Sequence, residues 1–169
     1  MTTTPAYAHL ACCIDDSAAA RSGLSEARRL LESGAAGRVT LVHVVPPPPL
    51  RDVIVGTVAT AFGGTPLQED YEAEHEEARL WLETVGAGLP AAERVLLVSG
   101  GDDSPAGEVC KWAEANSVDL LLTGVHSGAL ERLGLEIGSF SKHLAHHGPC
   151  PVLMVRPEPA PAPEEAPQA

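Results

Sequence analysis

Residues 124–141 read Gly124-Val-His-Ser-Gly-Ala-Leu-Glu-Arg-Leu-Gly-Leu-Glu-Ile-Gly138-Ser-Phe-Ser141. They follow an apolar run over residues 118–123, which is broken only by Asp119. The apolar run predicts a buried strand, and the segment from Gly138 onward predicts the start of a helix. A strand, a glycine-rich loop and a helix start can present backbone N–H groups and a positive dipole end to an anion. This stretch is therefore the best candidate for a functional site, with phosphate as the expected ligand.

The same alternation of apolar runs and helical segments extends over the rest of the chain. It predicts strands over residues 7–14, 39–45, 94–99, 119–123 and 151–156. Helices are expected from the Asp15-Asp16-Ser17 cap to Gly34 and over residues 68–89, 103–116 and 138–147. Such alternation is typical of right-handed crossovers in a single-domain α/β fold, with an open parallel sheet covered by helices on both faces. Ligands bind such sheets outside the carboxyl ends of the strands, where Asp15, Val44 and Gly124 would meet.

Two segments fall outside this pattern. Residues 46–68 contain the prolines 46–49 and Gly63-Gly64-Thr65-Pro66, and they form either a cover for a ligand or a surface insertion. The tail, residues 157–169, consists of Pro, Ala and Glu apart from one Gln, and we expect it to be disordered. The predicted domain therefore spans residues 1–156.

Composition excludes several classes of partner. The 169-residue chain carries a net charge of −12, which disfavours nucleic acid and an anionic membrane surface. No stretch is long and apolar enough to span a bilayer, and the first residues lack the features of a signal peptide. We therefore expect a cytoplasmic protein. Any phosphate ligand must be held mainly by backbone dipoles or a metal ion, because no basic patch is evident.

The cysteines and a histidine cluster each have a structural and a functional interpretation. The cysteines show no C-x-x-C spacing and are expected to be buried reduced thiols, with a redox role as the alternative (Cys12, Cys13, Cys110 and Cys150). His143, His146 and His147 share one face of the last predicted helix. They either bind zinc or complement the helix dipole at its C-terminus. We favour the dipole and predict no metal site.

Nothing in the sequence supports an enzyme. A Walker-type Gly-Lys-Ser/Thr is absent, and no Ser/His/Asp or Cys/His arrangement stands out. We expect at most very slow hydrolysis of a bound nucleotide and no catalytic residues.

Four segments together carry a family resemblance. They are the first strand leading into Asp15-x-Ser17, Leu41-Val-His43-Val44-Val45, Gly101-Asp-Asp-Ser-Pro-Ala…Glu108, and Gly138-Ser139-x-Ser141 leading to His147-Gly-Pro149-Cys150-Pro151-Val-Leu-Met-Val155-Arg156. Over residues 7–156 the chain resembles the universal stress proteins. That resemblance implies a five-stranded parallel sheet of order 3-2-1-4-5, similar to that of the adenine-nucleotide alpha hydrolases. It also implies a homodimer that pairs through the C-terminal strand, which would otherwise be an exposed apolar edge.

One branch of this family binds ATP with the pattern G-x2-G-x9-G-[ST]. By resemblance, Asp15 and the backbone of Val44 recognise adenine. The glycine after strand four and the loop that follows hold the ribose and phosphates, which maps the remaining candidates to Thr123, Gly124, His126, Gly128, Gly138, Ser139, Phe140 and Ser141. The alternative role of Asp15 is a helix N-cap, which Asp16 or Ser17 could equally supply.

The chain departs from the pattern in two places. Its spacing is G-x3-G-x9-G-S, so that Ser127 stands where the family has glycine, which tolerates φ > 0. Asp16 stands where glycine is frequent, and its carboxylate would repel a triphosphate or help to hold its Mg²⁺.

The sequence therefore predicts a cytoplasmic regulatory protein of the stress response that binds ATP, with or without Mg²⁺, and acts on an unknown protein partner. The alternative is a dimeric protein-interaction module of the same fold that binds no nucleotide. A metal or redox sensor is the third hypothesis.

Overall fold

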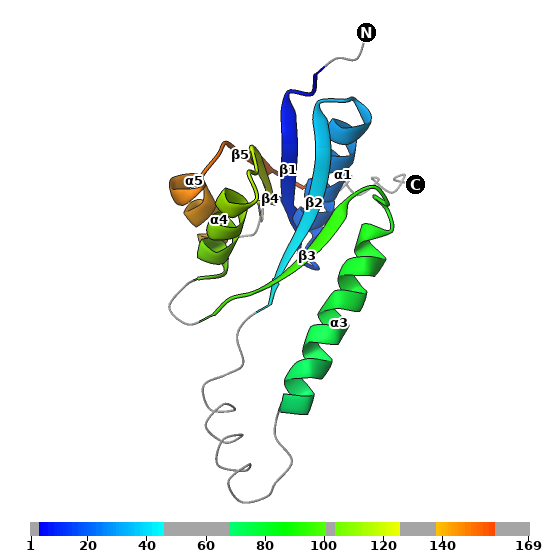
Figure 1. Cartoon of the computed structure of the whole chain (residues 1–169), viewed down its shortest axis with the longest axis vertical. Coiled ribbons are helices and arrows are strands. Elements are labelled where there is room, and N and C mark those ends of the chain that lie inside the picture. The colour runs from blue at the N-terminus through cyan, green and yellow to red at the C-terminus, as the bar shows by residue number, and fades with distance from the viewer. Residues whose placement is uncertain (1–3, 46–67, 101–103, 126–137, 158–169) are drawn as a thin grey trace, which may run out of the picture.

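The computed structural model describes residues 4–45, 68–100, 104–125 and 138–157. Strands and helices alternate along the chain as predicted (Figure 1). The elements are β1 (Tyr7–Cys13), α1 (Ala18–Glu32), β2 (Ala36–Val45), α3 (Gln68–Gly86), β3 (Glu93–Val98), α4 (Pro105–Ala115), β4 (Leu120–Gly124), α5 (Ser139–His147) and β5 (Val152–Val155).

The strands form one five-stranded parallel sheet of order β3-β2-β1-β4-β5. The predicted fold class and strand order are confirmed. The chain builds the sheet outward from β1 through β2 to β3 and then returns to the other side of β1 with β4. The boundary between β1 and β4 is thus the switch point, where crossovers diverge to opposite faces and leave a crevice.

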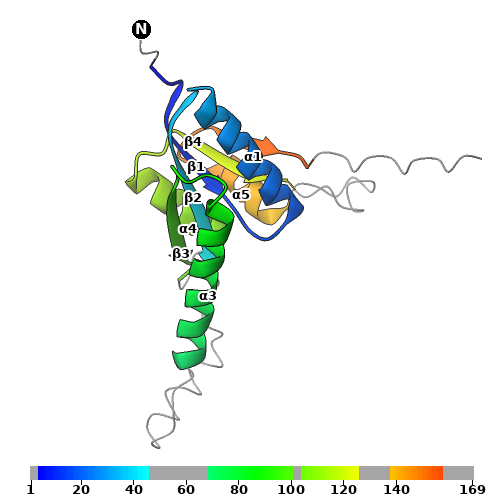
Figure 2. The ribbon, with the colours of Figure 1, turned by 90° about the vertical axis from the view of Figure 1, so that its right-hand side faces the viewer.

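Each strand sends alternate side chains to two separate cores, as the period of two requires. Leu10 and Cys12 pack with α1 and α3, whereas Ala11 and Val42 pack with α4 and α5. In Figure 1 α1 and α3 lie on the right of the sheet, and in Figure 2 they lie in front of it. Both faces of the sheet are therefore buried, which explains why the strands read as nearly continuous apolar runs.

Two of the predicted boundaries were wrong by three residues. The second strand begins at Ala36 rather than Val39, because Ala36 pairs with Tyr7 at the start of β1 and the strand therefore includes Gly37 and Arg38. The long helix ends at Gly86 rather than Leu89. Leu89 lies in the following turn, where its amide donates to the Gly86 carbonyl at 2.8 Å, and its side chain is buried in the core. Because Leu89 is buried, it continued the apolar pattern of the helix, and the predicted helix was therefore too long.

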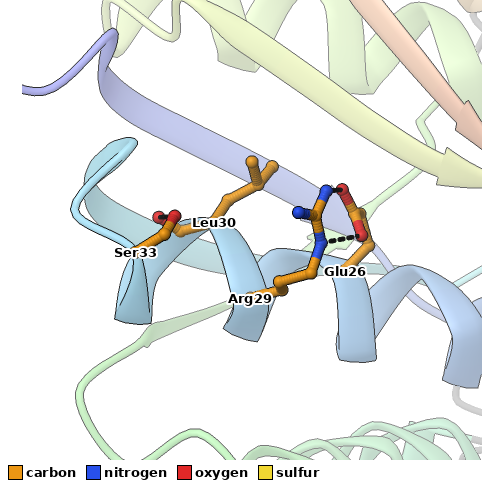
Figure 3. A network of polar contacts seen from close by, with 4 residues as sticks. All are labelled: Glu26, Arg29, Leu30 and Ser33. Atoms are coloured by element: carbon orange, nitrogen blue, oxygen red, sulfur yellow. Dashed lines mark hydrogen bonds and ion pairs between the residues drawn. The ribbon is translucent and has the colours of Figure 1, made fainter.

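Side-chain hydrogen bonds lie along the last two turns of α1. Figure 3 shows Arg29 paired with Glu26 through Nε–Oε2 at 2.8 Å, and Ser33 donating its hydroxyl to the Leu30 carbonyl at 3.1 Å. The hydrogen bond from Arg29 lowers the pKa of the Glu26 carboxyl. Arg29 is exposed and Glu26 is half-buried, so water still reaches the pair, which adds little to stability.

Residues 46–67 and 158–169 lie outside the described residues, so the predictions for the long connection and for the tail remain predictions. No helix in the described ranges is both long and apolar enough to cross a membrane.

Candidate functional site

A cavity of ≈ 310 Å³ opens at the carboxyl ends of β1, β2 and β4, at the predicted switch point. It is bounded by the ends of these three strands and by the starts of α1, α4 and α5. The lining residues are Cys13, Ile14, Asp15, Ser17, Ala20, Val42, His43, Val44, Pro105, Thr123, Gly124, Gly138, Ser139, Phe140 and Ser141. The predicted meeting of Asp15, Val44 and Gly124 at one crevice is confirmed.

Asp15 belongs to the turn that joins β1 to α1. Its Oδ1 accepts a hydrogen bond from the Ser17 amide at 2.9 Å, while the Ser17 hydroxyl accepts from the Ala20 amide at 3.1 Å. Ser17 is therefore the N-cap of α1, and Asp15 does not take that role. The Asp15 carboxylate is exposed, and its second oxygen has no partner among the described residues. That oxygen is available to a hydrogen-bond donor in the cavity.

The backbone of Val44 faces the same space. The Val42 carbonyl accepts from Ile14 on the β1 side, and the Val45 carbonyl accepts from Ser99 on the β3 side. Because backbone groups alternate between the two sides of a strand, the N–H and C=O of Val44 point toward β1. The β1–β2 pairing stops at Cys13 and Val42, so β1 no longer runs beside Val44. The N–H and C=O of Val44 therefore lie at the edge of the cavity without a partner on β1.

The start of α5 supplies a different kind of group. Its N-cap is Gly138, with φ −51° and ψ 152°, and no side chain in the described part of the chain caps the helix. By contrast, Ser17 caps α1 and Ser104 caps α4. The first turn of α5 therefore presents uncapped N–H groups and the positive end of the helix dipole at the cavity wall. Such a terminus is suited to bind an anion.

Hydroxyl groups fasten α5 to the end of β4. The Ser141 hydroxyl donates to the Gly124 carbonyl at 3.2 Å and lies 3.3 Å from the Thr123 hydroxyl. Both side chains are buried, with exposed fractions of 5% and 3%. Thr123 and Ser141 thus hold the helix start in place. The side-chain proton of Ser141 is already committed to the protein.

Gly124 and Gly138 are glycines for different reasons. A Cβ atom on Gly124 would lie 2.4 Å from the backbone C and O of Ala19, so close approach of β4 to α1 requires glycine there. A Cβ atom on Gly138 would meet no atom of the described residues within 4 Å. Packing within the described protein therefore does not explain the glycine at position 138.

The cavity holds little side-chain charge. Among its described lining residues Asp15 and His43 are the ionisable groups besides Cys13, and none is Lys or Arg. Burial, the largest cause, and the neighbouring groups Cys110, Asp15 and Cys150 together raise the pKa of the Cys13 thiol from 9.0 to about 12. Cys13 is therefore protonated at neutral pH and unsuited to act as a nucleophile.

Eight of the ten residues predicted to bind the ligand lie together at this cavity, whereas His126 and Gly128 are outside the described residues. Sequence reasoning did not select Cys13, Ile14, Ser17, Ala20, Val42, His43 and Pro105. His43 carried a usable signal, because it is a polar residue inside an otherwise apolar predicted strand. Ser17 was identified from the sequence as a possible helix cap and not as a ligand contact, and the remaining residues are apolar and could not be told from ordinary core residues.

The clusters set aside above show no built site. The four cysteines are free; Cys12 and Cys13 are buried, whereas Cys110 and Cys150 are only half-buried. The described residues contain no group of three or more His, Cys, Asp or Glu side chains that could hold a metal ion. The rings of His143 and His147 do meet, with centroids 4.6 Å apart, near the C-terminus of α5.

Comparison with known proteins now assigns the family. The model of the universal stress protein family matches residues 6–156. The chain belongs to the universal stress protein family. The resemblance inferred from the four sequence segments is thereby confirmed. A search of curated proteins finds no match.

Solved structures of universal stress proteins share this fold at low sequence identity. One from Burkholderia pseudomallei is 22% identical with a TM-score of 0.62, and the match covers 89% of this chain and 96% of that one. One from Arabidopsis thaliana with AMP bound is 14% identical with a TM-score of 0.55, covering 94% and 97%. One from Archaeoglobus fulgidus in complex with dAMP is 18% identical with a TM-score of 0.53, covering 92% and 99%.

Proposed function

We propose that this universal stress protein binds an adenine nucleotide in the cavity at the ends of β1, β2 and β4, and that it acts as a regulatory protein in a stress response. The observation that carries the proposal is the composition of the cavity wall. One wall offers the Asp15 carboxylate and the backbone of Val44, and another offers the uncapped start of α5. These are the groups that a base and a phosphate require.

The Asp15–Val44 wall suits adenine better than guanine. Adenine presents an amino group beside ring nitrogen acceptors, whereas guanine presents a carbonyl oxygen at the corresponding position. A carboxylate oxygen accepts a hydrogen bond from the adenine amino group but repels the guanine carbonyl. The N–H and C=O of Val44 provide one donor and one acceptor for the edge of the base. We therefore expect adenine nucleotides to bind in preference to guanine nucleotides.

The start of α5 suits a phosphate group. Its uncapped N–H groups and dipole attract an anion without a cationic side chain. Because no Lys or Arg lines the described part of the cavity, we expect a triphosphate to need Mg²⁺ for its remaining charge. ATP with Mg²⁺ is the proposed ligand, and AMP tests the adenine and first-phosphate contacts alone. The AMP and dAMP complexes of the Arabidopsis and Archaeoglobus proteins support an adenine nucleotide in this fold.

The role that we propose for this protein is that of a regulator rather than an enzyme. Occupancy of the cavity would bridge the end of β1, the end of β2 and the start of α5, and so favour one arrangement of these elements. A homodimer through β5 is part of the proposal. Val152–Val155 is apolar and only half-buried, and it lies at the edge of the sheet with β4 on one side.

Calorimetric titration with AMP, ATP, ATP–Mg²⁺ and GMP tests the proposal. We expect micromolar binding of an adenine nucleotide and at least tenfold weaker binding of GMP. The variant Gly138→Ala places a methyl group where the phosphate approaches and should weaken binding by about tenfold. Gly100→Ala is the matched control, because Cβ atoms at both positions meet no described atom within 4 Å and Gly100 lies outside the cavity.

The absence of binding heat and of a thermal shift at millimolar AMP and ATP would refute the proposal. The fold would then serve as an interaction module without a nucleotide.

A further inference from the structure

The hydrogen-bond ladder between β1 and β2 ends in an unusual way. The Ile14 amide donates to the Val42 carbonyl at 2.9 Å, in register with the Cys13–Val42 pair. In a regular parallel ladder the next bond would join the Val44 amide to the Ile14 carbonyl. Among the described residues that bond is not formed. The strands separate at the very step where the cavity begins.

A histidine ring takes the place of the missing bond. Nδ1 of His43 lies 2.8 Å from the Ile14 carbonyl oxygen. Since a carbonyl oxygen can only accept, Nδ1 carries the hydrogen of this bond. Ile14 is 5% exposed, so its carbonyl would lose stability if it were left without a donor. The His43 side chain therefore satisfies the acceptor that the ladder would otherwise assign to Val44.

The ring is held from its other side by α3. Trp81 lies against it with ring centroids 4.8 Å apart and an interplanar angle of 51°. Both His43 and Ile14 line the cavity, and the peptide that begins with the Ile14 carbonyl leads directly into Asp15. One side chain thus connects β1, β2 and α3 at the adenine end of the site.

We propose that His43 is a positioning residue that ends the β1–β2 ladder one step early and thereby leaves the N–H and C=O of Val44 to the ligand. The ring substitutes for a backbone donor: it satisfies Ile14, fixes the turn that carries Asp15, and keeps the strands apart at Val44. Trp81 seats the ring. The ligand in this statement is the adenine nucleotide of the proposed function, but the state of the Val44 amide is a property of the free protein.

Amide hydrogen exchange of the free protein, followed by NMR, tests the structural part. In the wild type we expect the Val44 amide to exchange at least ~100-fold faster than the Val42 amide, although both residues lie in β2 and both pair with β3. A Val44 amide protected as strongly as that of Val42 would overturn the proposal. This measurement needs no nucleotide.

Two matched variants test the donor itself. In His43→Asn the side-chain amide nitrogen stands where Nδ1 stands in histidine, whereas in His43→Gln it stands where Nε2 stands. We expect His43→Asn to bind AMP within about threefold of the wild type and His43→Gln to bind about tenfold more weakly, with both variants folded by urea denaturation. Equal affinities of the two folded variants would show that Nδ1 is not the group that matters.

A third experiment tests the contact with Trp81. We expect AMP to change the fluorescence of Trp81 in a Trp112→Phe background. We also expect Trp81→Phe to retain binding, because phenylalanine keeps an aromatic ring against His43. A silent Trp81 on binding would overturn the link to α3. If the wild type binds neither AMP nor ATP while the Val44 amide exchanges fast, the proposed function fails and the role of His43 in ending the ladder stands.

Discussion

The N-terminus of α5 has no capping side chain among the described residues. We therefore expect one substitution there to raise stability and lower ligand affinity. Gly138 is the N-cap, and its φ of −51° and ψ of 152° lie close to those of Ser17, which are −73° and 158°. A Cβ atom at position 138 would meet no atom of the described residues within 4 Å. Gly138→Asp therefore adds a capping carboxylate without strain. That carboxylate occupies the N–H groups that we assign to the phosphate.

The expected gain in stability is the sum of three small terms. An Asp in place of Gly at an N-cap gains a few tenths of a kcal/mol. A negative charge at the helix start gains about 0.3–1 kcal/mol. Removing a glycine from the unfolded chain gains about 0.4–1 kcal/mol. Together these give about 1–2 kcal/mol, which raises Tm by roughly 2–8 °C in a protein of this size.

The expected loss of affinity follows from the same groups. A phosphate at the start of α5 makes charge-assisted hydrogen bonds worth about 1.5–3 kcal/mol each. The carboxylate that Gly138→Asp introduces competes for these donors and repels the phosphate. Loss of one such bond weakens binding of AMP by about 10- to 100-fold.

Thermal unfolding and calorimetry with AMP measure both effects in one set of proteins. Gly138→Asn caps the helix without charge, so it should raise Tm less and weaken binding less than Gly138→Asp. Gly100→Asp adds the same charge outside the cavity, so it should leave the affinity for AMP unchanged and raise Tm only through the loss of a glycine from the unfolded chain. If Gly138→Asp binds AMP as tightly as the wild type, or lowers Tm, the assignment of the α5 start to a phosphate is wrong.

Three further predictions concern stability. Gly124→Ala places a methyl group 2.4 Å from the Ala19 backbone and should lower the free energy of unfolding by about 1–3 kcal/mol in urea denaturation; an unchanged midpoint would contradict the packing argument. Because the pKa of the Cys13 thiol is raised from 9.0 to about 12, the unfolded chain loses this proton first, so stability should fall between pH 9 and pH 12. Cys13→Ala should show a smaller fall in urea midpoint over that interval, and an identical fall would exclude Cys13 as the cause. Ser117 has a left-handed φ of 53°, so Ser117→Gly should preserve or raise stability by up to about 1 kcal/mol, whereas Ser117→Val should lower it by a similar amount.

The sequence predicted the fold well because apolar periodicity and capping residues reflect local physics. Ser17 and Ser104 cap the helices that the sequence placed after them. The errors arose where tertiary contacts overrode the local pattern. Gly37 and Arg38 join β2 because β1 already runs beside them, and Leu89 is buried from a turn rather than from a helix.

The site was predictable only in part. Asp15, Val44 and Gly138 could be selected because strand ends and helix starts are visible in sequence. Their partners depend on register, which sequence does not display. Whether His43 reaches the Ile14 carbonyl, or whether the Ser141 hydroxyl turns back to Gly124, follows from how strands and helices are placed against one another.

The described site is built from an interruption of backbone hydrogen bonding rather than from charged side chains. The β1–β2 ladder stops at Val42, and no side chain of the described residues caps α5. Backbone groups from two distant segments, without a partner among those residues, therefore face one cavity. Unpaired backbone groups cost free energy, so a histidine and two hydroxyls hold the surrounding chain in place around them. We propose that this construction lets a chain with a net charge of −12 bind the phosphate of a nucleotide. The dipoles of Val44 and α5 act over a few ångströms, whereas the net charge is screened beyond about 8–10 Å at physiological salt.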